Sequence, residues 1–182
     1  MARLPYLNPT DLAEGDRDLL KRMITLHRCL VNSPGMARAF GGLGQYIRYG
    51  SKLDPRLREL AILQIGWLAR SAYEWSHHVK LGLDFGVSEA DVHALIDDTA
   101  GKPTSLDDVS KLVLKGAREM TTDGEMTAET FAACQAAFGN EQAVDLTITI
   151  AFYNAVVRVL GTLKIDVEPE YQPYLDRFPL PA

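Results

Sequence analysis

Three observations predict that this chain folds as a single all-α domain. Apolar side chains recur with a period close to 3.6 residues along most of its length, which is the spacing of one helix face. Capping and turn residues separate these stretches at short intervals. With 182 residues, 47% of them hydrophobic and 24% charged, the chain has the size and composition of one globular domain.

The first half of the chain predicts three helices. Residues 16–31 carry apolar side chains at helical spacing, and the turn Asn32–Gly35 leads into a second helix that runs to about Arg48. Asp54 and Pro55 suit the N-cap and the first position of a third helix. Its apolar pattern continues until Phe85 and Gly86, so the local sequence alone predicts one long central helix.

The second half predicts four more helices and a docked tail. Ser88 begins a short helix to about Asp97, and residues 105–108 cap a helix to about Met120. Further helices span residues 127–138 and 141–163; the β-branched run at 144–150 is compatible with a strand, but the apolar pattern continues without a turn and favours a helix. The Pro-rich tail from Glu168 carries three aromatic residues, which predicts an extended segment that docks on the protein surface.

Charge and cysteine content argue against several functions. The net charge is −5 and no run of Lys or Arg forms a basic stripe, so a nucleic-acid partner is not expected. The N-terminus lacks the apolar region of a secretory signal, and no uninterrupted apolar stretch reaches the roughly 18 residues of a membrane span. Cys29 and Cys134 lack metal-site or redox-pair spacing. We therefore expect a cytoplasmic protein with reduced, buried thiols, no membrane partner and no metal bound by these cysteines.

The densest group of proton-transfer side chains lies between Glu59 and His78. Ser71, Glu74 and His78 are three and four residues apart, so they share one face of a helix. A carboxylate beside an imidazole raises the pKa of the histidine and suits general acid–base catalysis, although such a pair also occurs as a solvated surface pair. On one continuous helix Glu59 and Glu74 would lie about 22 Å apart. A shared site requires a turn between about Ala69 and Ala72, where the sequence has neither Gly nor Pro.

Neighbouring side chains are candidates for substrate binding. An arginine can pair with a substrate carboxylate through two hydrogen bonds, and aromatic or polar residues next to Glu74 can line a pocket, although the aromatic ones also fit the core. Glu59 also fits a first-turn acid favoured by the helix dipole. The isolated histidines, His27 and His93, receive no role. The substrate-binding candidates are Arg48, Arg70, Ser71, Tyr73, Trp75 and His77.

The segment Arg58–Leu63 (RELAIL), with Tyr73–Trp75 (YEW) and His78, resembles the carboxymuconolactone decarboxylase family, also called AhpD-like. The resemblance covers about residues 35–165, so the N-terminal helix and the Pro-rich tail are additions to a single domain of residues 1–182. It implies an AhpD-like helical bundle and a homotrimer or homohexamer. It also implies a helix break near Ser71, which would bring Glu59 toward Glu74 and His78.

The family resemblance implies two chemistries. Its thiol peroxidases use Glu-x11-Cys-x2-Cys-x3-His, but here Ser71 and Glu74 stand at the cysteine positions, and neither side chain can form a sulfenic acid or a disulfide. Its decarboxylases act on carboxylated lactones without a metal or cofactor. We therefore expect a cofactor-free lyase or isomerase of a small carboxylated or lactone metabolite, with Glu59, Glu74 and His78 as catalytic residues. The alternatives are a peroxidase or peroxiredoxin-type oxidoreductase, by family alone, and a non-catalytic oligomer that binds a small ligand.

Overall fold

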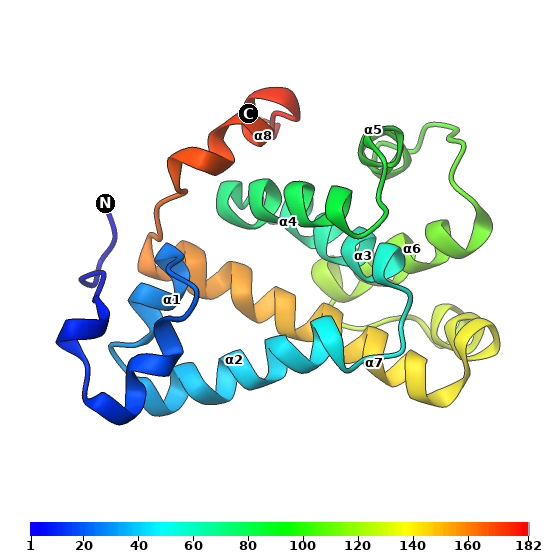
Figure 1. The fold of residues 1–182 in the computed structure, drawn as a ribbon. Helices are drawn as coiled ribbons and strands as arrows, with labels where there is room; N and C mark the ends of the chain where they lie inside the picture. The colour runs from blue at the N-terminus through cyan, green and yellow to red at the C-terminus, as the bar shows by residue number, and fades with distance from the viewer. Residues whose placement is uncertain (182) are drawn as a thin grey trace.

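Helix α3 (Pro55–Leu68) forms the buried centre of an all-α bundle, which confirms the predicted fold class (Figure 1). The computed structural model describes residues 1–181. Helices α4 (Ala72–Asp84), α6 (Asp108–Thr122) and α7 (Ala128–Leu163) pack against α3, and α2 (Pro34–Tyr49) and α5 (Glu89–Thr99) complete the bundle. Two hydrophobic cores form around α3, because Ile62 and Ile65 belong to one core and Leu60 and Leu63 to the other.

The predicted break between Glu59 and Glu74 is present between α3 and α4. Helix α3 begins as expected, with the Asp54 side chain accepting a hydrogen bond from the amide of Leu57 at 3.1 Å. It ends because Arg70 adopts the left-handed conformation, with φ of 48°. The amide of Ser71 then donates to the carbonyl of Gly66 at 3.0 Å, which is the hydrogen bond of a Schellman motif. Arginine thus occupies a position where glycine is usual.

Gly66 lets α4 fold back closely against α3 after this turn. A Cβ atom at Gly66 would lie 3.3 Å from the backbone nitrogen of Trp75, which is tighter than most Cβ contacts. The absence of a side chain at this position therefore sets the spacing of the two helices. That spacing places α4 beside the part of α3 that carries Glu59.

The N-terminal region differs from the single helix predicted over residues 16–31. It forms the 3-10 helices η1 (Pro9–Asp11) and η2 (Glu14–Leu20), followed by the short helix α1 (Thr25–Leu30). Ile24 is extended, so the helix cannot run through it. The amide of Thr25 instead donates to Glu168 at 2.6 Å, and the Thr25 hydroxyl donates to the carbonyl of Asp166 at 2.8 Å. Hydrogen bonds to a distant part of the chain replace those of the predicted helix.

Helix α7 contains the predicted boundary between two helices, at Gly139. This residue has φ of 74° and ψ of 172°, which is non-helical and marks a kink. The β-branched run after it is helical, as predicted. One window in α7 is long and apolar enough to cross a membrane by length and composition, a test that core helices of soluble proteins also pass. Leu146, Ile150 and Leu160 in α7 are buried in the first core.

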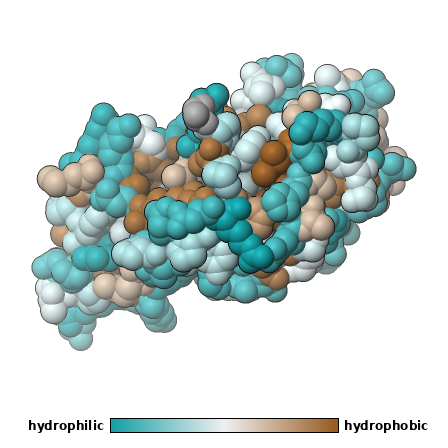
Figure 2. All heavy atoms as spheres, turned by 90° about the horizontal axis from the view of Figure 1, so that it is seen from above, coloured by the Kyte–Doolittle hydropathy of each residue, from teal (hydrophilic) through white to brown (hydrophobic). Residues whose placement is uncertain are grey.

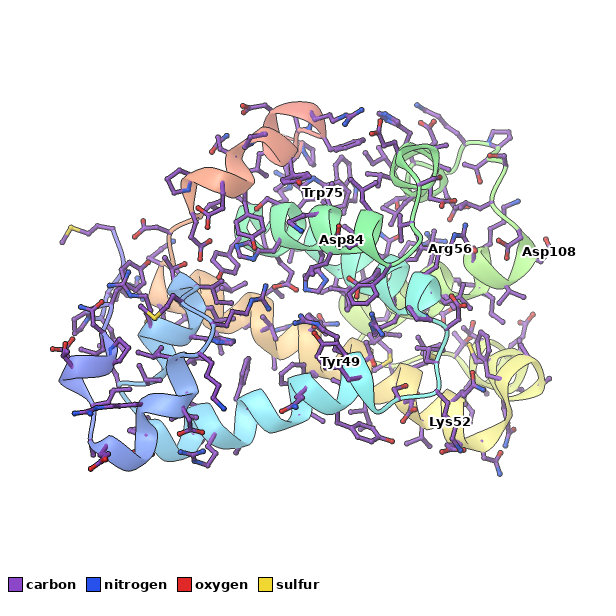
Figure 3. All side chains as sticks on the ribbon, in the orientation of Figure 1. Tyr49, Lys52, Arg56, Trp75, Asp84 and Asp108 are labelled. Carbon is purple, nitrogen blue, oxygen red and sulfur yellow. The ribbon has the colours of Figure 1, made fainter. Side chains whose placement is uncertain are left out.

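The C-terminal segment docks on the bundle, as predicted, but it is partly helical rather than extended. Its turns are η3 (Pro169–Tyr171) and α8 (Gln172–Arg177), which lie against α4 (Figure 1). The indole nitrogen of Trp75 donates to the carbonyl of Phe178 at 2.7 Å, and Trp75 points from α4 toward this segment (Figure 3). From above, hydrophobic residues lie in hollows between hydrophilic ridges (Figure 2). Buried Phe178 anchors the segment to the second core.

Candidate active site

His78 on α4 lies between two carboxylates in the protein interior. Its Nδ1 atom is 2.7 Å from Oε2 of Glu59 on α3, and its Nε2 atom is 3.1 Å from Oε1 of Glu74, one turn earlier on α4. All three side chains are buried. The α3–α4 turn therefore assembles the three residues that the sequence predicted as catalytic.

Glu59 is held from its other side by Arg58. The Nε and Nη2 atoms of Arg58 donate to Oε1 of Glu59 at 3.1 and 3.0 Å, and Nη1 donates to the carbonyl of Arg48 at 3.1 Å. The Arg58 guanidinium also lies over the ring of Phe85, 4.7 Å from its centroid. Arg58 was not among the predicted site residues. Because a buried charge on an apolar helix needs a partner, Arg58 is paired with Glu59.

These contacts set the protonation of His78 and Glu59. Burial lowers the pKa of His78, but Glu74 and Glu59 raise it more, to about 9. Burial raises the pKa of Glu59, but His78 and Arg58 together hold it below its ordinary value. At neutral pH His78 is therefore an imidazolium with both ring nitrogens facing carboxylates, and Glu59 is ionised. Arg58, Glu59, His78 and Glu74 form a line of alternating charges.

Glu74 is the member of this line with unused hydrogen-bonding capacity. Its Oε1 atom is buried and, although close to His78, has no hydrogen-bond partner of good geometry among residues 1–181. A buried carboxylate oxygen without such a partner is costly unless a ligand or water completes it. Glu74 also lines a cavity, so its carboxylate group is available to a bound molecule there.

The cavity has a volume of about 680 Å³ and lies between α4 and α7 on one side and η2, α1 and α2 on the other. Its walls are largely aromatic and aliphatic. Tyr153 from α7 meets His78 edge to face, with 5.0 Å between ring centroids, and burial and Glu74 both raise the pKa of Tyr153. Tyr49, at the end of α2, contributes to the rim (Figure 3). Apolar lining residues include Leu26, Leu30, Phe40, Leu81, Phe152 and Val156.

The structure separates the predicted substrate-binding residues into two groups. Arg48, Tyr73 and His77 line the cavity with Glu74 and His78. Three others lie outside its lining and serve the fold. Arg70 is exposed in the α3–α4 turn, Ser71 is the N-cap of α4, and Trp75 is buried in the second core.

His77 is engaged in a structural contact rather than open to a ligand. Its Nε2 atom lies 2.7 Å from Glu168, and its ring is stacked between Tyr73 and Tyr171 at centroid distances of 4.0 and 3.5 Å. Burial lowers the pKa of His77. Burial alone would raise the pKa of Glu168, but the hydrogen bonds from His77 and Thr25 outweigh it and lower this pKa to about 2. We call His77, Glu168, Tyr73, Tyr171 and Thr25 the Glu168 clamp.

His27 on α1 lines the cavity, although the sequence analysis gave it no role. Burial and the nearby Arg22 and Arg48 together lower the pKa of His27 to about 4. His27 is therefore a neutral imidazole at pH 7. Nothing in the local sequence marks this residue, because α1 is placed at the cavity by its tertiary contacts with α2, η2 and the C-terminal segment.

The two cysteines and the possible metal ligands among residues 1–181 are not arranged for redox or metal chemistry. Cys29 and Cys134 are free and buried, as predicted, and burial raises the pKa of both thiols, which disfavours the reactive thiolate. Within residues 1–181 the structure contains no group of three or more His, Cys, Asp or Glu side chains placed to hold a metal ion.

Comparisons with known proteins agree with this architecture. Residues 34–101 match the sequence model of the carboxymuconolactone decarboxylase family. No curated protein matches the sequence. An uncharacterized peroxidase-related protein from Ralstonia eutropha JMP134, described as an alkylhydroperoxidase AhpD core, superimposes with a TM-score of 0.81 at 16% identity, over 96% of this chain and 95% of that one.

Two further solved structures share the fold. A Cys-to-Ala variant of the debrominase Bmp8, in complex with 2,3,4-tribromopyrrole, gives a TM-score of 0.75 at 17% identity, over 97% of this chain and 99% of that one. An uncharacterized peroxidase-related protein from Silicibacter sp. TM1040 gives 0.74 at 17% identity, over 93% and 92%. At these identities the matches establish a common fold and leave the chemistry to the site residues.

Proposed function

Starting from a chain that belongs to the carboxymuconolactone decarboxylase family through its residues 34–101 and its fold, we propose a cofactor-free lyase or isomerase. It acts by acid–base chemistry on a small carboxylated or lactone metabolite. The observation that carries this proposal is the Glu74 carboxylate, which faces the cavity while an imidazolium supports it from behind.

The proposed proton path follows the line of charges. His78 gives its Nε2 proton to the Glu74 carboxylate, which protonates a carbon of the bound molecule, and Glu59 stabilises His78 throughout. In a decarboxylation the bond between the ring carbon and the carboxylate breaks, carbon dioxide leaves, and the electron pair is delocalised onto the adjacent carbonyl oxygen. Protonation at carbon completes the product, and a solvent proton restores His78.

Arg48 supports the developing negative charge in this proposal. It lines the cavity and is near Tyr153 and Glu59, which raise the pKa of Arg48 against the effect of burial. Arg48 has no carboxylate within 4.0 Å among the described residues, so its charge is open to an oxyanion or carboxylate of the substrate. Such a charge-assisted contact in a water-poor cavity is stronger than one at the surface.

The competing function is binding without turnover. A cavity lined by aromatic side chains supports ligand binding whatever the chemistry. Peroxidase activity is the weaker alternative, because Ser71 and Glu74 stand at the positions of the two cysteines and both thiols of the chain are buried elsewhere. Robust peroxide reduction with a thiol donor, lost when Cys29 or Cys134 is replaced, would contradict the proposed function.

We also propose a cytoplasmic homotrimer or homohexamer. Large apolar side chains are exposed on α2 and on α7, among them Leu43, Tyr46, Val144 and Ile148. Exposed apolar residues on adjacent helices favour burial against another subunit. Analytical ultracentrifugation tests the assembly, and a monomer at micromolar concentration would contradict it.

The test of the proposed function is a screen of carboxylated lactones and cyclic carboxylic acids in D2O. Release of carbon dioxide detects a lyase, and deuterium incorporation at carbon detects either reaction. Glu74→Gln and His78→Gln should each lower the rate by roughly 10²–10⁴-fold, because general acid–base catalysis contributes this much. Glu129→Gln and His93→Gln, at exposed positions, are the matched controls. Unchanged turnover in both site variants would remove the assignment, and tight binding without turnover would favour a binding protein.

A further inference from the structure

The charged side chains that line the cavity carry an excess of positive charge, because Lys21, Arg22, Arg38, Arg48 and the protonated His78 outnumber Asp18 and Glu74. Arg38 is paired with Asp16 and Asp18 at distances of 3.1 and 2.9 Å. His78 is paired with Glu59 and Glu74. Arg22 and Arg48 line the same cavity, and neither has a carboxylate within 4.0 Å among residues 1–181. Two half-buried guanidinium groups therefore face the cavity without a counter-charge.

His27 lies with these two arginines at the cavity wall. All three side chains line the same cavity, and both arginines lower the pKa of His27. The ring also forms a hydrogen bond with the backbone of Arg22. Glu168 acts on the pKa of His27 in the opposite direction but more weakly. The three side chains come from the segment before α1, from α1 and from α2.

We propose that Arg22, His27 and Arg48 form a carboxylate-binding site that holds the acid group of an organic ligand at the wall of the cavity. Two guanidinium groups suit a carboxylate, and a neutral imidazole can add a hydrogen bond without a second charge. The aromatic side chains of Phe40 and Phe152, packed with 4.7 Å between centroids, line the same cavity and favour an organic acid over an inorganic anion. This inference rests on the proposed function, since it names the acid group by which the cavity holds the substrate.

The N-terminal segment is therefore part of the ligand site. Arg22 and His27 lie before residue 34, where the match to the family sequence model begins. The acid–base residues come from the matched region, whereas two of the three anion-binding residues come from outside it. Substrate selection and proton transfer are thus assigned to different parts of the chain.

The experiment measures binding of benzoate to the full chain by calorimetry, with benzamide as the neutral molecule of the same shape and inorganic phosphate as the anion without an apolar part. Benzoate should bind at least tenfold more tightly than benzamide or phosphate. Arg22→Gln and Arg48→Gln should each weaken benzoate by about tenfold or more, because a charge-assisted contact is lost. Arg17→Gln, outside the cavity lining, should bind benzoate as the parent chain does.

A second readout uses the His27 ring in NMR spectra recorded as a function of pH. A bound carboxylate offsets Arg22 and Arg48, so benzoate should raise the pKa of His27 from about 4. By linkage, benzoate should bind more tightly as the pH falls through the raised pKa that His27 has in the complex, where benzoate is still ionised. The ring signals of His93, which is exposed and outside the cavity lining, should not change when benzoate is added at a fixed pH.

The outcomes separate this inference from the proposed function. Glu74→Gln should lose turnover and keep benzoate binding. Three results would each overturn the carboxylate site. They are equal affinity for benzoate and benzamide, parent-like binding by both Arg22→Gln and Arg48→Gln, and no detectable binding of benzoate at about 10 mM. None of these results depends on whether the chain turns over a substrate.

Discussion

Glu59 Oε2 and His78 Nδ1 lie 2.7 Å apart, although the two residues are 19 positions apart in the sequence and belong to different helices. The contact exists because α3 ends at Leu68 and α4 returns alongside it. It gives His78 a second carboxylate in addition to Glu74. A single helical Glu–His pair would sit at the surface, whereas this arrangement keeps a charged imidazole in the interior.

Replacing Glu59 should destabilise the fold strongly. Glu59→Gln leaves the buried guanidinium of Arg58 and the ring of His78 without their shared anion. Breaking a buried ion pair from one side costs about 3–5 kcal/mol. Urea denaturation of Glu59→Gln and of the exposed Glu129→Gln measures the difference. Equal stability of the two variants would show that Arg58 and His78 find other partners.

The stability of the fold should depend on pH through His78. Its pKa is raised from the ordinary 6.5 to about 9, so the protonated form stabilises the native state. This contribution is fully present below pH 6.5 and is lost as the pH rises through about 9. Its size is on the order of 3 kcal/mol. The free energy of unfolding should fall over this range in the parent chain and much less in His78→Gln; parallel profiles would contradict the assignment.

The Glu168 clamp should order both ends of the chain. Glu168→Gln removes the carboxylate that accepts from Thr25, Tyr73 and His77. Hydrogen exchange should accelerate in α1 and in residues 166–181, while Glu170→Gln, at an exposed neighbouring position, should leave it unchanged. Because the pKa of Glu168 is lowered to about 2, the clamp's contribution is present above pH 4.5 and is lost as the pH falls toward 2. Exchange that stays slow in α1 would show that other contacts hold it.

Gly66 should be intolerant of a side chain. Gly66→Ala places a Cβ atom 3.3 Å from the backbone nitrogen of Trp75, so α4 has to shift away from α3. We expect a loss of about 1–3 kcal/mol, as in other overpacked cores. Gly161→Ala is the matched control, since nothing lies within 4 Å of its Cβ position, and it should be neutral or stabilising by up to about 1 kcal/mol. Thermal unfolding compares them, and a Gly66→Ala variant as stable as Gly161→Ala would contradict the close approach.

The sequence predicts the helices that begin with clear caps and misjudges those that depend on distant contacts. Asp54, Ser88 and Thr127 cap helices where expected, because a cap is a local interaction. The helix expected over residues 16–31 is interrupted because Thr25 bonds to Asp166 and Glu168, which no local pattern contains. The left-handed turn at Arg70 is also hidden locally, and only the family resemblance implied it.

The residues of the candidate site are likewise predictable where their arrangement is local and hidden where it depends on distant contacts. The spacing of Glu74 and His78 on one helix face is visible in the sequence, and the family resemblance adds Glu59 to that pair. Arg58 and His27 were missed, because the first is recognised by its burial and the second by the fold of the N-terminal segment. Trp75 shows the opposite error, because it was predicted to bind substrate. Its ring instead packs in the core, and its indole nitrogen bonds to the C-terminal segment.

The Glu168 clamp makes the C-terminal segment part of the ligand cavity's support. Glu168 is bonded to Thr25 at the start of α1, the helix that carries His27. A protease that removes the chain after α7 would therefore remove the carboxylate that holds the start of α1 at one wall of the cavity. Glu168 thus supports the shape of the cavity from outside the acid–base residues, although it contributes no group to proton transfer.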